Sequence, residues 1–240
     1  MLFALIVFTI PHGACDVYLP AWILNPPWER SGIYWLFALG IFGFFALFTW
    51  SLTLLSYDFF VALLAALIIW HYGSLDALLL YPNRSIAWLI GSMGRGMLVL
   101  IAPLHFKPLE TNQLFSEFIP EPGSRILDAL YSFSGYIILI ALLLEGAAFL
   151  ASKFIEGRGL PRDMSAHVTE SLFILATFKL VSPLVGMSFY FLMLHPFRHI
   201  ARVVDYIPEE RGQILDMGGL LKSLPSLFQR TNLITFLASF

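Results

Sequence analysis

Long apolar stretches, separated by short polar or proline-containing segments, dominate the pattern of hydrophobic and polar positions along this chain. Each stretch is continuously apolar rather than alternating, which favours helices over strands. A helix of roughly 20 residues crosses the hydrocarbon core of a membrane, and backbone amides within lipid must bond to one another. The pattern therefore predicts membrane-spanning helices at about residues 1–22, 33–55, 59–80, 86–104 and 126–154.

The next apolar stretch, about residues 166–206, is too long for one span. As a single helix it would measure about 60 Å, twice the thickness of the hydrocarbon core. Lys179, Ser182 and Pro183 lie near its middle, and a proline inside a helix interrupts the hydrogen bonding. We therefore predict two spans joined by a tight turn, with a single kinked helix that projects into water as the alternative. The polar segment 105–125 is predicted to be a loop over one mouth of the bundle.

Together these elements predict an all-α, polytopic transmembrane helix bundle of about seven spans over residues 1–206. Residues 207–240 are predicted to form a cytoplasmic or interfacial segment. The first ten residues lack a basic start and a small-residue cleavage site, which favours a retained helix over a removable signal peptide. With the N-terminus outside, the cytoplasmic side receives most of the basic residues, as is usual in membrane proteins: Arg30, Arg84, Lys153, Arg158, Arg162, Arg202, Arg211, Lys222 and Arg230.

Composition strengthens the membrane prediction and argues against several other classes of protein. The chain is 58% hydrophobic and only 12% charged, with a mean hydropathy of +0.79. Soluble domains carry about 25% charged residues, so this chain has too few charges to cover a globule in water. The net charge of −2 and the lack of a basic block argue against a nucleic-acid partner. A single cysteine, Cys15, provides neither an intrachain disulfide nor a cysteine-rich metal motif.

Four of the six histidines occupy comparable places in their predicted spans. His12 lies late in the first span, His71 late in the third, and His195 and His199 late in the last. If residues 166–206 form two spans, these three helices run in the same direction and the four imidazoles share one depth. With a single helix there, the last pair would lie at the opposite face of the membrane. The metal hypothesis therefore depends on the predicted turn.

His195 and His199 are four residues apart, which places both imidazoles on one helix face. Imidazole is a suitable ligand for iron, zinc, copper and nickel. The alternative is that these histidines only form hydrogen bonds between helices. Ionisable groups at membrane depth are costly, however, and are usually functional when present. Four of them at one depth favour a metal site.

Two aspartates are candidates for orienting the metal ligands. Asp16 follows His12 by four residues, so its carboxylate can accept the second N–H of that imidazole. Asp76 follows His71 by five residues and points elsewhere unless the helix opens near Gly73.

The sequence does not assign a definite role to four further polar residues. His105 and His167 are predicted to lie in loops. Arg95 and Glu145 lie within spans and are expected to face the interior of the bundle, either as a structural pair or as support for a site.

The motifs around these residues resemble the Brp/Blh family of bacterial and archaeal membrane β-carotene 15,15′-dioxygenases. The resemblance extends from about Phe8 to Arg202. Cys15 stands where the family commonly has leucine, and no motif matches after about Arg211. The matching segments are, in order, Pro11-His12-Gly13-Ala14-Cys15-Asp16, Trp70-His71-Tyr72-Gly73-Ser74-Leu75-Asp76, Arg95-Gly96 with Ala102-Pro103, and His195-Pro196-Phe197-Arg198-His199.

The resemblance implies an inner-membrane enzyme that holds ferrous iron, Fe(II), through histidines. Such an enzyme splits the central double bond of β-carotene with O2 and forms two molecules of retinal. Carried over residue by residue, His12, His71, His195 and His199 match the family's iron-binding histidines. The expected partners are a lipophilic carotenoid, O2 and the bilayer, with a rhodopsin as a further candidate that receives retinal.

Three other functions remain open from the sequence. A membrane di-iron desaturase or hydroxylase needs more histidine clusters than the six histidines here provide. A metal or solute transporter is the second, although no repeated halves are evident. A non-catalytic partner of a rhodopsin is the third.

Overall fold

A computed structural model describes residues 32–77, 81, 85–116, 124–157, 164–195 and 199. The chain divides into two compact units, one of residues 51–187 and one of residues 1–50 together with 188–240, and each is treated by itself. Every regular element among the described residues is a helix, which agrees with the predicted all-α class. The first predicted span and the predicted segment 207–240 lie outside the described residues.

Four helices are long and apolar enough to cross a membrane. They are α3 (Gly32–Leu55), α4 (Tyr57–Ala77), α5 (Ile86–Phe106) and α8 (Ser134–Phe154). Large apolar side chains are exposed along α3, α4 and α8, as expected for faces that contact lipid. The spans predicted at residues 33–55 and 86–104 are therefore confirmed as helices, and the span predicted at 59–80 is confirmed as far as Ala77. The total of about seven spans stays a prediction.

The apolar stretch 126–154 contains two helices rather than one. α7 (Arg125–Ser132) ends at Phe133, whose φ of −103° and ψ of 9° interrupt the helical path before α8 begins. The hydroxyl of Ser134 donates to the carbonyl of Tyr131 across this break, at 2.8 Å. The predicted fifth span is thus shortened at its start, because local side-chain hydrogen bonding competes with helix continuation there.

The chain turns in the middle of the stretch 166–206, as predicted. α9 (Met164–Leu180) ends before Val181 and Ser182, and α10 (Pro183–Phe189) begins at the proline. Proline suits the first position of a helix because its missing N–H would have no helical partner there. Gly186 packs on the ring of Phe178, where an added Cβ would lie 2.9 Å from a ring carbon. α10 therefore folds back on the end of α9, and a single continuous helix is excluded.

The described residues of the predicted loop at 105–125 are largely helical, which corrects the placement of His105. α5 continues through His105 to Phe106, and α6 (Pro108–Ser116) follows after Lys107. The carbonyl of Pro103 accepts hydrogen bonds from the backbone N–H of Lys107 and the hydroxyl of Thr111, at 3.0 and 2.9 Å. These bonds tie α6 to the end of α5, so a segment with a polar sequence stays ordered.

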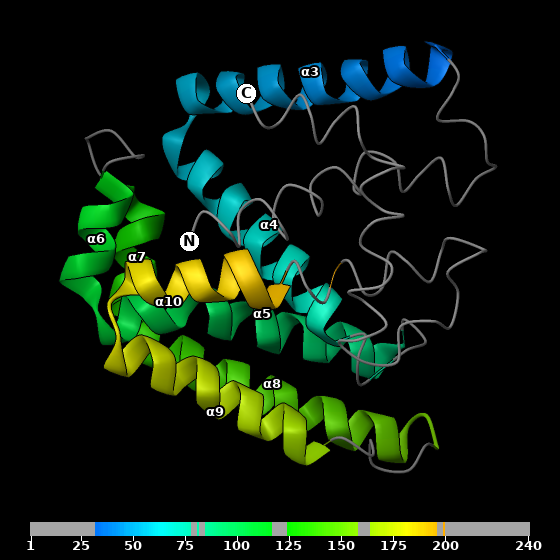
Figure 1. Ribbon diagram of the computed structural model, residues 1–240, viewed down its shortest axis with the longest axis vertical. Helices are drawn as coiled ribbons and strands as arrows, with labels where there is room; N and C mark the ends of the chain where they lie inside the picture. Colours follow the sequence, from blue (N-terminus) through cyan, green and yellow to red (C-terminus); the bar gives the residue numbers. More distant parts are fainter. Residues whose placement is uncertain are drawn as a thin grey trace. The chain divides into compact units, whose positions relative to one another are not determined.

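Within residues 51–187, α5 is the central helix and packs against α4, α8 and α9 (Figure 1). Glycines allow this close contact. An added Cβ at Gly73 of α4 would overlap the carbonyl oxygen of Ser92, and one at Gly96 would overlap that of Ile69. A Cβ at Gly94 would lie 2.8 Å from the carbonyl oxygen of Ala141 on α8. Small residues at helix crossings let backbones approach closely, which is how membrane helices associate.

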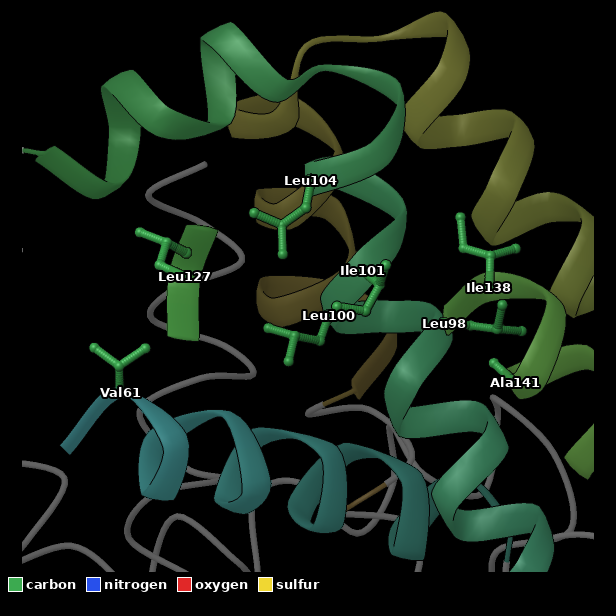
Figure 2. Close-up of a cluster of buried hydrophobic side chains, with 8 residues drawn as sticks. All are labelled: Val61, Leu98, Leu100, Ile101, Leu104, Leu127, Ile138 and Ala141. Atoms are coloured by element: carbon green, nitrogen blue, oxygen red, sulfur yellow. The ribbon is translucent and has the colours of Figure 1, made fainter. Parts of the chain in front are cut away.

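A cluster of buried apolar side chains fills the space between α4, α5, α7 and α8 (Figure 2). α5 supplies four of its eight members, and the other three helices supply the rest. The cluster consists of Val61, Leu98, Leu100, Ile101, Leu104, Leu127, Ile138 and Ala141. It lies on the part of α5 that follows the glycines, so the crossing and the apolar core are continuous along one helix.

We predict that Gly73→Ala lowers the stability of the protein in detergent by about 1–3 kcal/mol, the usual cost of overpacking. The added methyl group meets a backbone carbonyl, which has no rotamer by which to move away. Thermal unfolding followed by circular dichroism measures the effect. Gly146→Ala is the matched control because nothing lies within 4 Å of its added Cβ. Equal unfolding midpoints for the two variants would show that α4 and α5 are not tightly packed at Gly73.

Candidate functional site

His195 and His199 are adjacent and buried, as the four-residue spacing predicts. Their exposed fractions are 2% and 5%, and their ring centroids lie 6.4 Å apart with an angle of 27° between the ring planes. A five-residue π-helical turn, Tyr190–Leu194, directly precedes His195, whose backbone N–H donates to the carbonyl of Tyr190. π-helical turns are rare and occur frequently at functional sites.

The chemistry of the histidine pair suits a metal ion. A bond from a metal ion to an imidazole nitrogen is roughly 2.1 Å long and points away from the ring. Rings with centroids 6.4 Å apart can therefore share one ion only if a nitrogen of each is directed at it, and that orientation stays a prediction. Neutral imidazole suits iron and other transition metals, so the pair can supply two ligands.

His71 lies on a regular part of α4, at an exposed position. Its ring contacts that of Tyr72 edge-on, with centroids 5.1 Å apart. α4 stays α-helical through Gly73 to Ala77, and Asp76 is only 2% exposed. The helix therefore does not open near Gly73, and the side chains of His71 and Asp76 leave the helix in different directions.

His12 and Asp16 lie outside the described residues, so their roles stay predictions. Within the parts of the chain that the structure describes, no group of three or more histidine, cysteine, aspartate or glutamate side chains is arranged to hold a metal ion. The convergence of four histidines on one ion is likewise a prediction. The structure shows only that His195 and His199 are buried and lie next to each other.

A second polar cluster lies inside residues 51–187, where α5, α8 and α9 meet. Arg95 of α5 is fully buried, and its Nε lies 3.2 Å from Oε1 of Glu145 on α8. Its Nη2 lies 2.7 Å from Nδ1 of His167 and 3.7 Å from a carboxylate oxygen of Glu170, both on α9. The expectation that Arg95 and Glu145 face the interior is confirmed, and the two side chains form an ion pair.

His167 belongs to α9 and is 5% exposed, which corrects its predicted place in a loop. Nη2 of Arg95 lies within 3.0 Å of both ring nitrogens of His167. A guanidinium only donates hydrogen bonds, so the nitrogen of His167 that bonds to it is the acceptor. Residues at positions i, i+3 and i+4 share a helix face, and His167, Glu170 and Ser171 have this spacing. That pattern is the sequence signal from which the cluster was predictable.

Ser171 completes the connection between α8 and α9. Its hydroxyl donates to Oε2 of Glu145 at 2.5 Å and is also 3.1 Å from the carbonyl of His167. The carboxylate of Glu145 therefore meets both Arg95 and Ser171. The loss of one partner of such a buried ion pair leaves the other charge buried without compensation, which costs far more than the loss of both partners.

Tyr81 packs beside this cluster, outside the long helices. Its ring contacts Gly91 and lies 6.4 Å from the ring of Phe149. Burial, and then the negative charge of Glu145, raise the pKa of the Tyr81 hydroxyl. The side chain is therefore a neutral phenol throughout the physiological pH range.

The fold and the histidine pair define a multi-pass, all-helical membrane protein with a candidate metal site. The family model of beta-carotene 15,15′-dioxygenase matches residues 3–240, nearly the whole chain. The protein belongs to this family. No curated protein and no solved structure gives a significant match.

We predict that Arg95→Met and Glu145→Met each destabilise the protein by about 3–5 kcal/mol, because each leaves a buried charge without its partner. The double variant is expected to lose much less than the sum, since it removes both charges. Denaturant titration in detergent measures the four free energies of unfolding. Lys107→Met is the control because its pair with Glu110 is solvent-exposed, and it should cost less than about 1 kcal/mol. Strict additivity would show that Arg95 and Glu145 do not interact.

Proposed function

We propose that this protein is an iron-dependent membrane dioxygenase that cleaves the central 15,15′ double bond of β-carotene or a related carotenoid. The products are two molecules of retinal. The observation that carries the proposal is the family match over residues 3–240, and the buried pair His195 and His199 supports it. We place the protein in the inner membrane with its N-terminus outside.

In this proposal Fe(II) is held by His12, His71, His195 and His199. When bound, the ion supplies the centre at which O2 is activated. The imidazoles hold it as neutral ligands, and Asp16 orients His12 by accepting the second N–H of its ring. Asp76 would orient His71 only if α4 opened near Gly73, and α4 is continuous there. Asp16 is therefore the better of the two aspartates for this role.

The protein's own contribution is to position the substrate and exclude water. Each carbon of the cleaved bond receives one oxygen atom from O2, so the overall reaction neither takes up nor releases a proton. No general acid or base is required, and the residues act by orientation. The long apolar helices are consistent with a substrate that is dissolved in lipid and enters laterally between helices.

Expression in cells that accumulate β-carotene tests the cleavage. We expect loss of the orange colour and formation of retinal with the unaltered chain, and neither with His195→Ala or His199→Ala. His105→Ala is the matched control because His105 is exposed, bonds to Ser134 and does not belong to the proposed set of iron ligands. Full cleavage by either variant of the pair would remove that histidine from the site. Unchanged carotenoid with folded, iron-loaded protein would favour a transporter or a non-catalytic rhodopsin partner.

Metal analysis of the purified protein provides an independent test. We expect one iron per chain, because only one set of four histidines is available to the site. His195→Ala should lower the iron content, since a site that loses one of its few ligands binds much more weakly. Two irons per chain would contradict the proposal and favour a di-iron desaturase or hydroxylase.

A further inference from the structure

The buried rings of Tyr190, His195 and His199 lie next to one another. Tyr190 is 3% exposed, and its ring centroid lies 6.4 Å from that of His195 with an angle of 26° between the planes. The rings of His195 and His199 repeat this distance with an angle of 27°. Tyr190 therefore shares the face of the helix from which both histidines project.

Tyr190 reaches this face because the turn that contains it is π-helical. In an α-helix, residues five apart point about 140° away from each other, since each residue advances by about 100°. In the π-helical turn the N–H of His195 bonds to the carbonyl of Tyr190, which brings the fifth residue back over the first. An α-helical turn would instead place Phe191 on the face of His195.

We propose that Tyr190 is a positioning residue of the iron site, where its ring fixes the plane of the His195 imidazole. This inference rests on the function proposed above. Aromatic rings with centroids about 4.5–7 Å apart pack favourably, so the phenol restricts rotation of the imidazole. Side chains that orient a metal ligand typically change metal affinity by about 10–100-fold when they are replaced. The π-helical turn is the backbone feature that places Tyr190 beside His195.

Neighbouring aromatic residues provide a matched pair of variants. Tyr190→Leu removes the ring beside His195, and Phe191→Leu removes a similar ring that contacts Tyr190 edge-on, with centroids 5.5 Å apart. The affinity of the full-length protein for ferrous iron is measured in detergent without oxygen, by competition with a chelator. We expect Tyr190→Leu to weaken iron binding about tenfold and Phe191→Leu to affect it much less, because Tyr190 keeps its place beside His195. Tyr190→Phe keeps the ring and should restore the affinity.

Cobalt(II) provides a readout of ligand geometry that does not depend on activity. Its visible spectrum should change in Tyr190→Leu and match that of the unaltered protein in Tyr190→Phe and Phe191→Leu. Thermal unfolding of the metal-free variants shows whether any loss is a loss of fold. Equal stability of Tyr190→Leu and Phe191→Leu with different iron affinities would support positioning rather than packing.

The possible failures are distinguishable. Weaker binding in Phe191→Leu but not in Tyr190→Leu would mean that the turn is α-helical, and the inference would be wrong. Unchanged affinity and cobalt spectrum in both variants would also overturn it, while sensitivity to His195→Ala would preserve the proposed function. If the unaltered protein binds no iron, the proposed function fails and the role of Tyr190 fails with it.

Discussion

Close backbone contact between α5 and its two neighbours is the constraint on which the arrangement of residues 51–187 depends. Lipid provides no hydrophobic drive for helices to associate, so they rely on tight packing and on polar contacts between helices. Gly96 brings α5 against α4, and Gly94 brings it against α8. Arg95 stands between these two glycines. The same approach that packs the backbones therefore brings the guanidinium within 3.2 Å of Glu145.

The buried histidines of this protein divide into two kinds by what their rings contact. His167 accepts a hydrogen bond from Arg95, and its other nitrogen is 3.7 Å from Glu145. A nitrogen that faces a guanidinium is a poor metal ligand, because the two cations would repel each other. His195 and His199 have aromatic rings among their neighbours. The contact with Arg95 therefore makes His167 a poor candidate for a metal ligand.

Much of this fold was predictable from local sequence, because membrane helices are defined by continuous apolar runs. The helices at 33–55, 59–80 and 86–104 and the turn before Pro183 are examples. The pairing of Arg95 with Glu145 was predictable as one of two options, since buried charges within spans need partners. The break at Phe133 and the helical continuation through His105 were not, because each depends on one or two side-chain hydrogen bonds. His167 was missed because its polar neighbours resemble a loop, and its partner lies 72 residues earlier.

The predicted metal site depends on the turn between α9 and α10. Had residues 166–206 formed one helix, His195 would have lain a membrane thickness away from the depth predicted for His12 and His71. α10 instead folds back on α9 at Gly186 and Phe178, and the π-helical turn follows α10 in the sequence. The single helix that would have separated the histidines is therefore excluded, and their convergence on one ion stays a prediction. The first histidine of the motif at residues 195–199 directly follows the π-helical turn, and its ring lies beside that of Tyr190.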